Sequence, residues 1–446
     1  MLRLPRVAGR PLGVPRPMVP VRARPMPAVR PYASATSPRT ARAGGVSIKS
    51  GVLFAGLSAF AVALTVYGVW DYFAAFRVWP KELREPLRAG LKARNKGQWE
   101  YSAAKFREAL RIAHTLDDAT IGSDRLLKTT GIAIALASVL EEDEKWQDAA
   151  LVYVDALDEV LQRSESRSPP EKMRGVALAQ KVGELAQRSD VLVPPCPVAD
   201  SDACQTSEPA EGYLAWSVEE MLRLVQAPRS EGPVLLADLD LPAWVSAQDL
   251  GASVEALGAF YASHQQADLA VPLYLQAIAT LLPPQAQGRP PPTVADRCRA
   301  AILMNNISQA LTQTRTDTET LLKAMAWATK GLDLATLTSY RAGFLTALPP
   351  DERALLLQIS GHDPHSVAPV APVVETASEA RLEQVKQQCL GTQFVLLYNL
   401  GMFYSMHNDK ETARILFQRA MRQAEFLQLR EARTQCARAL KRLERA

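Results

Sequence analysis

Side chains that could perform catalysis or bind a metal ion are few in this sequence, and they lie far apart. It contains five histidines and five cysteines among 446 residues. The only close pair of histidines, His362 and His365, lies in a linker-like stretch that would hold metal ligands poorly. There is no GxxxxGKS/T phosphate loop, no GxSxG nucleophile elbow and no HExxH zinc helix. We therefore predict a protein that is not an enzyme, with no catalytic residue, metal site, cofactor or small-molecule substrate.

The cysteines form no recognisable framework. None belongs to a CxxC pair, and no cysteine–histidine cluster has the spacing of a zinc site. Cys196 and Cys204 lie in one loop-like stretch. We favour two free thiols there over a local disulfide, which would require an oxidising compartment. The other three are Cys298, Cys389 and Cys436.

The other chemistry that this sequence could support is the capture of peptide segments on a helical surface. Tyr398, Met402 and Met406 recur every four residues, so they would share one face of a helix. Two flexible methionines beside an aromatic ring make an apolar surface that adapts to varied or unfolded segments. We take these residues as a candidate client groove. The alternative is that a C-terminal helix buries them.

Equivalent positions elsewhere give weaker signals. In segment 251–284 they are Glu255, Ala259 and Ser263. A charged clamp for the C-terminal carboxylate of a chaperone is absent, because the positions that would form it are Leu87, Leu91, Ile134 and Ser138. This disfavours a chaperone-docking import receptor.

The element that would position these residues is a helical hairpin repeated along the chain. A period of about 34 residues, with Leu-Gly-x-x-Tyr on a first helix and Ala-x-x-x-Phe/Tyr-x-x-Ala on a second, is the tetratricopeptide (TPR) pattern. Small residues let the two helices touch, and aromatic residues fill the gaps between hairpins. A single hairpin leaves an apolar face bare, so stacking must stabilise it. We therefore predict an all-α TPR solenoid.

Four copies of the pattern are recognisable by the residues that would pack within them. The copy nearest the N-terminus has Gly90, Trp99, Phe106 and Ala109. Segment 130–163 has Leu136, Trp146, Ala149 and Tyr153. Segment 251–284 has Leu257, Gly258, Tyr261, Ala270 and Tyr274. Segment 394–427 matches at every expected position, with Leu400, Gly401, Tyr404, Ala413, Phe417 and Ala420.

Less regular segments complete the expected body of hairpins. Degenerate hairpins at 171–228 and 294–336 would join the copies into an array spanning 80–340. A stretch rich in proline, serine and aspartate predicts a loop insertion at 191–212.

The C-terminal part should contain a linker, a hairpin and a cap. Prolines predict a linker with at most one short helix at 341–378, before a TPR hairpin at 379–428. An amphipathic capping helix should occupy 429–446. We interpret its basic face as a solubilising cap, with contact to anionic lipid or to a partner as the alternative.

The N-terminal segment resembles an import signal. Residues 1–48 are rich in arginine and proline and contain no acid, which predicts a disordered mitochondrial presequence. The stretch Arg30–Ser34 is similar to a site cut by the matrix processing peptidase, so we expect the mature chain to begin near Ala33. A basic tail without import function is the alternative.

A transmembrane helix is expected at 50–73. Ser50–Trp70 contains no charged residue, and at about 1.5 Å per residue it would span a hydrocarbon core of about 30 Å. Aromatic residues follow it, as they do at a membrane interface. Basic residues precede it, so the N-terminal side should stay in the matrix, and the body should face the intermembrane space.

Charge is distributed unevenly along the chain. The whole chain carries +4, and residues 1–70 hold ten basic residues and no acidic one. The remainder holds 41 basic and 47 acidic residues, a balance of −6. A mildly acidic body argues against nucleic acid as a partner.

With these features in place, the chain resembles the fungal TPR adaptor subunit of the mitochondrial inner-membrane i-AAA protease. The resemblance is carried by the aromatic membrane exit at 71–73, the segment Trp79–Leu83, the first hairpin from Gly97 to Arg111, and the stretch Glu144–Ala150. It implies a single-pass inner-membrane protein that binds unfolded or damaged membrane proteins and passes them to the protease. The alternative is a TPR assembly factor for a respiratory-chain complex.

Overall fold

The structure is a computed structural model that describes residues 78–445 apart from short gaps. The gaps are 123, 163–166, 199–207, 226–235, 237–238, 240, 243, 284–290, 315–316 and 364–378. The predicted presequence at 1–48 and the predicted transmembrane helix at 50–73 lie outside the described residues. Within the part that is described, no helix is both long and apolar enough to cross a membrane.

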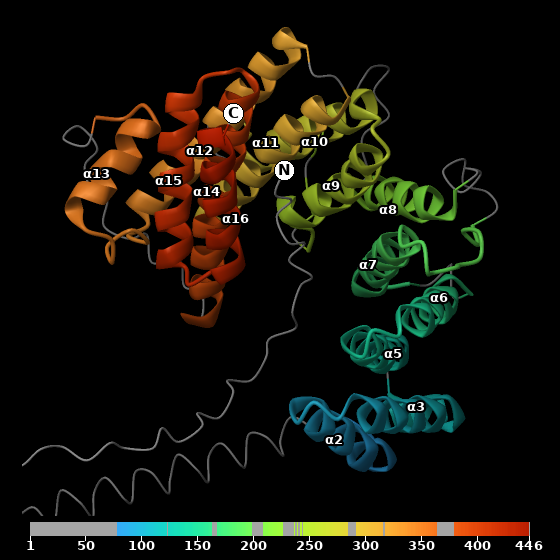
Figure 1. Ribbon diagram of the computed structural model, residues 1–446. Coiled ribbons are helices and arrows are strands. Elements are labelled where there is room, and N and C mark those ends of the chain that lie inside the picture. Colours follow the sequence, from blue (N-terminus) through green and yellow to red (C-terminus); the bar gives the residue numbers. More distant parts are fainter. Residues whose placement is uncertain are drawn as a thin grey trace, which may run out of the picture. The chain divides into compact units, whose positions relative to one another are not determined.

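Helices are the only regular elements of any length in the described ranges, where no β-strand occurs (Figure 1). The N-terminal ones are α2 (Lys81–Asn95), α3 (Trp99–Thr115), α4 (Asp118–Ile121), α5 (Arg125–Glu142), α6 (Trp146–Gln162), α7 (Pro169–Ala186) and α8 (Pro209–Val225). The C-terminal ones are α9 (Ala247–Ser263), α10 (Ala267–Leu281), α11 (Val294–Thr314), α12 (Thr318–Arg341), α13 (Pro350–Ile359), α14 (Glu379–Met406), α15 (Lys410–Phe426) and α16 (Arg430–Arg445).

Two units divide the chain, with a boundary inside α2. From Glu85 onward the described helices belong to one compact unit. Residues 78–84 belong to the other unit, in which Nε of Arg84 donates a hydrogen bond to the carbonyl of Trp79 at 2.9 Å.

The helices of the larger unit pair in chain order. The hairpins are α2/α3, α5/α6, α7/α8, α9/α10, α11/α12 and α14/α15, and α16 packs on α15. The second helix of each hairpin also packs on the first helix of the next. In addition, the first helices α5, α7, α9, α11 and α14 contact one another in succession. This is the arrangement of a tetratricopeptide-type array, so the prediction of an all-α fold built from such hairpins is confirmed for the described residues.

Within a hairpin, a glycine of the first helix lies against an aromatic ring of the second. A Cβ atom added to Gly90 would lie 3.1 Å from the ring of Phe106. The same test at Gly258 gives 3.0 Å to Tyr274. Only glycine allows the two backbones to come this close without displacing the ring.

The turn that reverses the chain is also the same in four hairpins. The second residue after each first helix lies in the left-handed region, with φ of 71° at Gly97, 60° at Glu144, 62° at Gln265 and 66° at Asn408. In each turn the next backbone N–H donates to a carbonyl five residues back, for example from Lys145 to Leu140 at 2.9 Å. This is the Schellman motif, which satisfies carbonyls at the helix end.

The predicted loop at 191–212 is shorter than expected, because α8 begins at Pro209. A proline at the start of a helix loses no hydrogen bond there, and Ala210 is buried. The described part of the loop is pinned to the array. The side chain of Gln147 exchanges two hydrogen bonds with the backbone of Leu192, at 2.7 and 2.8 Å.

The first half of the predicted linker at 341–378 is packed against the array. It contains α13, and Phe344, Leu345 and Leu348 are buried in the C-terminal core. Arg422 of α15 pairs with Glu352 of α13 at 3.3 Å. A free connection is therefore excluded for the part through Asp363.

Candidate functional site

The surface that successive hairpins build together is carried by their first helices. We call the exposed side of α2, α5, α7, α9, α11 and α14 the first-helix face. These helices belong to different hairpins, yet polar side chains join each to the next. The face is therefore a structure of the whole array, and no single repeat contains it.

Ion pairs link the first three helices. Arg94 of α2 pairs with Glu142 of α5 at 2.5 Å and donates a second hydrogen bond to Ser138 at 3.1 Å. Glu141 of α5 pairs with Lys181 of α7 at 2.8 Å. All four charged side chains are partly exposed, so these pairs position the helices more than they stabilise them.

Hydrogen bonds and one ion pair continue the series through α9 and α11. Gln180 of α7 donates to Ser253 of α9. Glu255 of α9, whose side chain is 15% exposed, pairs with Arg299 of α11 at 2.6 Å. Burial raises the pKa of the Glu255 carboxyl above its ordinary value, and the charge of Arg299 only partly opposes this effect.

Between α11 and α14 the contact becomes fully buried. Nδ2 of Asn399 donates to Oδ1 of Asn305 at 2.9 Å, and neither residue is exposed. Gln393 of α14 joins the second helices, donating to Thr336 of α12 and accepting from Gln423 of α15. A buried polar network of this kind fixes one register of packing.

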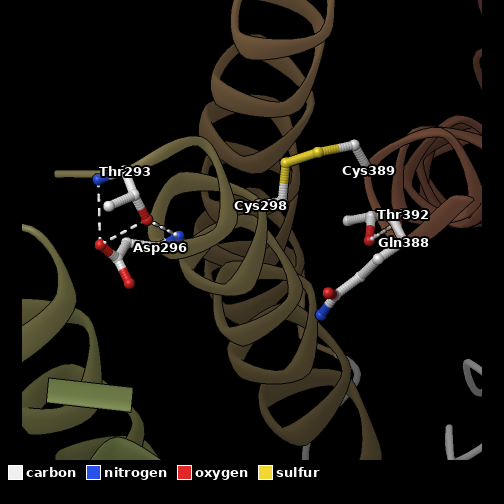
Figure 2. Close-up of a disulfide and its surroundings, with 6 residues drawn as sticks. All are labelled: Thr293, Asp296, Cys298, Gln388, Cys389 and Thr392. Carbon is white, nitrogen blue, oxygen red and sulfur yellow. Dashed lines mark hydrogen bonds between the residues drawn. A yellow bond between two sulfur atoms is a disulfide. The ribbon is translucent and has the colours of Figure 1, made fainter. Parts of the chain in front are cut away.

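A disulfide joins the same two helices. Figure 2 shows Cys298 of α11 bonded to Cys389 of α14, 91 residues further along the chain, with their Cα atoms 5.2 Å apart. Both cysteines are completely buried. Cys196 is also in a disulfide, whose other half lies outside the described residues. The expectation of a free thiol is therefore wrong for Cys196, and the bond between Cys298 and Cys389 was not expected. Cys436 is free and buried.

The predicted client groove is only partly open. Tyr398 is 4% exposed, its ring lies 5.4 Å from that of Phe417, and the charge of Arg442 on α16 acts on its hydroxyl. Tyr398 is therefore a core residue beneath the C-terminal helix, and its assignment to the groove is corrected. Met402 is half-buried against the C-terminal core, and Met406 is 42% exposed.

The residues expected to pack within the repeats lie inside the hairpins. Four of them are half-buried: Trp99, Trp146, Tyr261 and Tyr404. The others are buried: Gly90, Phe106, Ala109, Leu136, Ala149, Tyr153, Leu257, Gly258, Ala270, Tyr274, Leu400, Gly401, Ala413, Phe417 and Ala420. The half-buried rings have polar neighbours, such as Glu211, which accepts a hydrogen bond from the hydroxyl of Tyr261 at 2.7 Å.

Side chains that could perform catalysis or bind a metal ion do not cluster in the described part of the chain. No group of three metal-ligating side chains occurs there. Nε2 of His362 contacts a carboxylate oxygen of Asp333, and this contact joins the end of α13 to α12. His365, its proposed neighbour, lies outside the described residues.

The pairs across the first-helix face were missed by the sequence reasoning. Glu255 and Ser138 were noted at groove positions, but their partners come from different repeats. The signal that could have found them is charge at equivalent positions of consecutive repeats. Arg94 and Glu141 each lie four residues after the small residue of their repeat, which is Gly90 in the first and Ala137 in the second.

Comparisons with known proteins give fold-level likeness alone. No family model and no curated protein matches this chain. BtubC (BKLC) from P. vanneervenii has 16% identity and a TM-score of 0.36, over 61% of this chain and 89% of that one. A tetratricopeptide repeat protein from Parabacteroides merdae has 12% identity and a TM-score of 0.32, over 81% of this chain and 99% of that one. A circular tandem repeat protein has 14% identity and a TM-score of 0.20, over 81% and 75%.

Proposed function

We propose that this protein is a non-catalytic adaptor that holds other proteins on its first-helix face. The observation that carries the proposal is the succession of first helices from α2 to α14, joined at each step by polar side chains. An extended surface built from many repeats can hold a long segment of a partner.

The more specific proposal concerns the partner. The resemblance to the i-AAA protease adaptor supports a role in which unfolded or damaged membrane proteins are bound and passed to that protease. The presequence and the apolar segment expected at 50–73 support a place in the mitochondrial inner membrane. The buried disulfide supports a body in an oxidising compartment, which agrees with the intermembrane space and disagrees with a reducing one.

The character of the face limits how clients bind. From α2 to α11 its side chains alternate in charge and are engaged in pairs, as in Arg94–Glu142 and Arg299–Glu255. The predicted apolar groove contributes one well-exposed side chain, Met406 at the end of α14. An unfolded client would therefore place an apolar residue at this end and run its polar backbone along the paired charges.

Site-specific crosslinking tests this arrangement. A photo-crosslinking amino acid at Met406 should capture clients in intact mitochondria. The same amino acid at Ile415, which is 49% exposed on the second helix α15, serves as the matched control. Equal capture from both positions would contradict binding on the first-helix face.

Affinity purification from detergent-solubilised mitochondria tests the partner. We expect the i-AAA protease in the eluate. If the protease is missing and one respiratory complex dominates, the assembly-factor alternative replaces the adaptor proposal. Protease treatment of mitoplasts tests topology, because a body that survives opening of the outer membrane would face the matrix.

A further inference from the structure

The C-terminal helices differ in charge from the rest of the array. Residues 410–445, which form α15 and α16, contain ten basic and four acidic residues, a balance of +6. Residues 71–409 contain 31 basic and 43 acidic residues, a balance of −12. The array is therefore acidic along most of its length, and its positive charge is concentrated at one end.

The geometry of α16 separates a packed face from a charged one. At about 100° per residue, Cys436, Ala439 and Leu443 fall on one side of the helix, and all three are buried. All six basic residues of α16 are exposed: Arg430, Arg433, Arg438, Lys441, Arg442 and Arg445. Five of them lie on the opposite half and Arg433 lies at its border, and the same half also carries the exposed acids Glu431 and Glu444. The apolar side of α16 packs on α15, so the side of α16 that faces solvent is charged.

Few of these charges are neutralised within the structure. Arg433 lies 3.7 Å from Glu425, and Arg442 interacts electrostatically with Tyr398. Among the described residues, Arg438, Lys441 and Arg445 form no ion pair. They follow one another along the last two turns of the helix, so their positive fields add.

We propose that this exposed face of α16 binds an anionic lipid surface by electrostatic attraction. Clusters of four to eight basic residues on one helix are the usual signature of such binding. The six charges extend over about 24 Å of helix, which matches a plane with many negative headgroups better than one small acidic site. Binding would hold the C-terminal hairpin, including Met406 on α14, next to the membrane. The proposal does not depend on the protease or on the identity of the clients.

Flotation with liposomes tests the proposal on the full chain. The protein is first placed in nanodiscs of phosphatidylcholine, so that any membrane segment is already occupied. It is then mixed with liposomes of phosphatidylcholine, either alone or with phosphatidylglycerol as one third of the lipid. We expect the protein to float with the anionic liposomes only, and to be released when salt is raised to about 0.5 M, because screening weakens surface attraction.

A triple variant removes the charges without touching the packed side. Arg438→Gln, Lys441→Gln and Arg445→Gln should weaken binding to anionic liposomes on the order of 100-fold, since each basic residue contributes about a fivefold factor. The matched control is Lys92→Gln, Arg107→Gln and Arg111→Gln, which removes three exposed charges from α2 and α3 and should bind like the wild type.

A thiol readout shows whether α16 stays docked in each variant. Burial raises the pKa of Cys436 to about 12, so this thiol should resist maleimide as long as the helix remains packed. Equal flotation of the wild type and the triple variant, with Cys436 protected in both, would overturn the proposal. Binding of wild type to soluble poly-glutamate, but not to anionic liposomes, would also overturn it, because the face would then recognise acidic protein.

Discussion

Gly401 lies directly against the ring of Phe417, and a Cβ atom added to this glycine would come within 2.8 Å of it. The two residues belong to α14 and α15, the helices of the last hairpin. This contact is closer than the two equivalent ones, which are those of Gly258 with Tyr274 and of Gly90 with Phe106. The ring is fully buried, so it has little room to move away.

Gly401→Ala should therefore destabilise the protein by about 1–3 kcal/mol, the usual range for overpacking a core. The matched control is Gly391→Ala on the same helix, where an added Cβ would meet nothing within 4 Å. That change should stabilise by about 1 kcal/mol, because alanine is the better helix former. Urea unfolding of the two variants measures both values, and effects of the same sign would contradict the explanation.

At the left-handed turn positions, introducing a glycine should stabilise the protein. Glu144, in the turn after α5, has a φ of 60°, which is unfavourable for a residue with a Cβ atom. Glu144→Gly should stabilise the protein by about 1 kcal/mol, because glycine relieves this strain. Thermal unfolding should show a higher midpoint.

The control for Glu144→Gly is a glycine substitution at a position with right-handed helical backbone. Ala104→Gly lies on the exposed side of α3 and should cost about 1 kcal/mol. A lower midpoint for Glu144→Gly would mean that its side chain makes a contact worth more than the strain.

The disulfide between Cys298 and Cys389 should contribute strongly to stability. It closes a segment of 91 residues, and a bridge of this span typically stabilises by about 2–5 kcal/mol. We expect reduction of the wild type to match the double variant Cys298→Ser, Cys389→Ser in urea unfolding. As a control, the variant Cys196→Ser, Cys204→Ser should keep most of its sensitivity to the reductant.

The ion pair of Glu255 and Arg299 predicts an unusual pH dependence. The folded-state pKa of Glu255 is raised above 4.5, its ordinary value, so its contribution to stability is present below pH 4.5 and is lost as pH rises through the folded pKa. Arg299→Gln removes the charge that opposes this shift. The variant should lose about 3–5 kcal/mol near pH 7, since a buried carboxylate is left unpaired, and less near pH 5.

Denaturant unfolding at the two pH values measures that difference. Adding Glu255→Gln to Arg299→Gln should recover part of the loss at pH 7 and flatten the dependence on pH. A loss that is independent of pH would show that Arg299 acts through packing and not through charge.

Local periodicity was enough to predict the hairpins. The spacing of Leu400, Gly401, Ala413 and Phe417 fixes which faces of two neighbouring helices can meet, because the helical repeat places such residues on one side. The same reasoning failed for Tyr398, whose exposure depends on α16. A helix packed over a surface from another part of the chain leaves no mark in the spacing of that surface.

The sequence by itself determined the helical class, the hairpin copies, the basic side of the last helix and the lack of a catalytic motif. Each of these depends on residues within about 34 positions of one another, the span of one repeat. Only the tertiary structure decided which first helices meet, and hence the pairing of Arg299 with Glu255 and the bond between Cys298 and Cys389. Such contacts depend on how whole hairpins stack, which is a property of their combined surfaces and not of any single stretch of sequence.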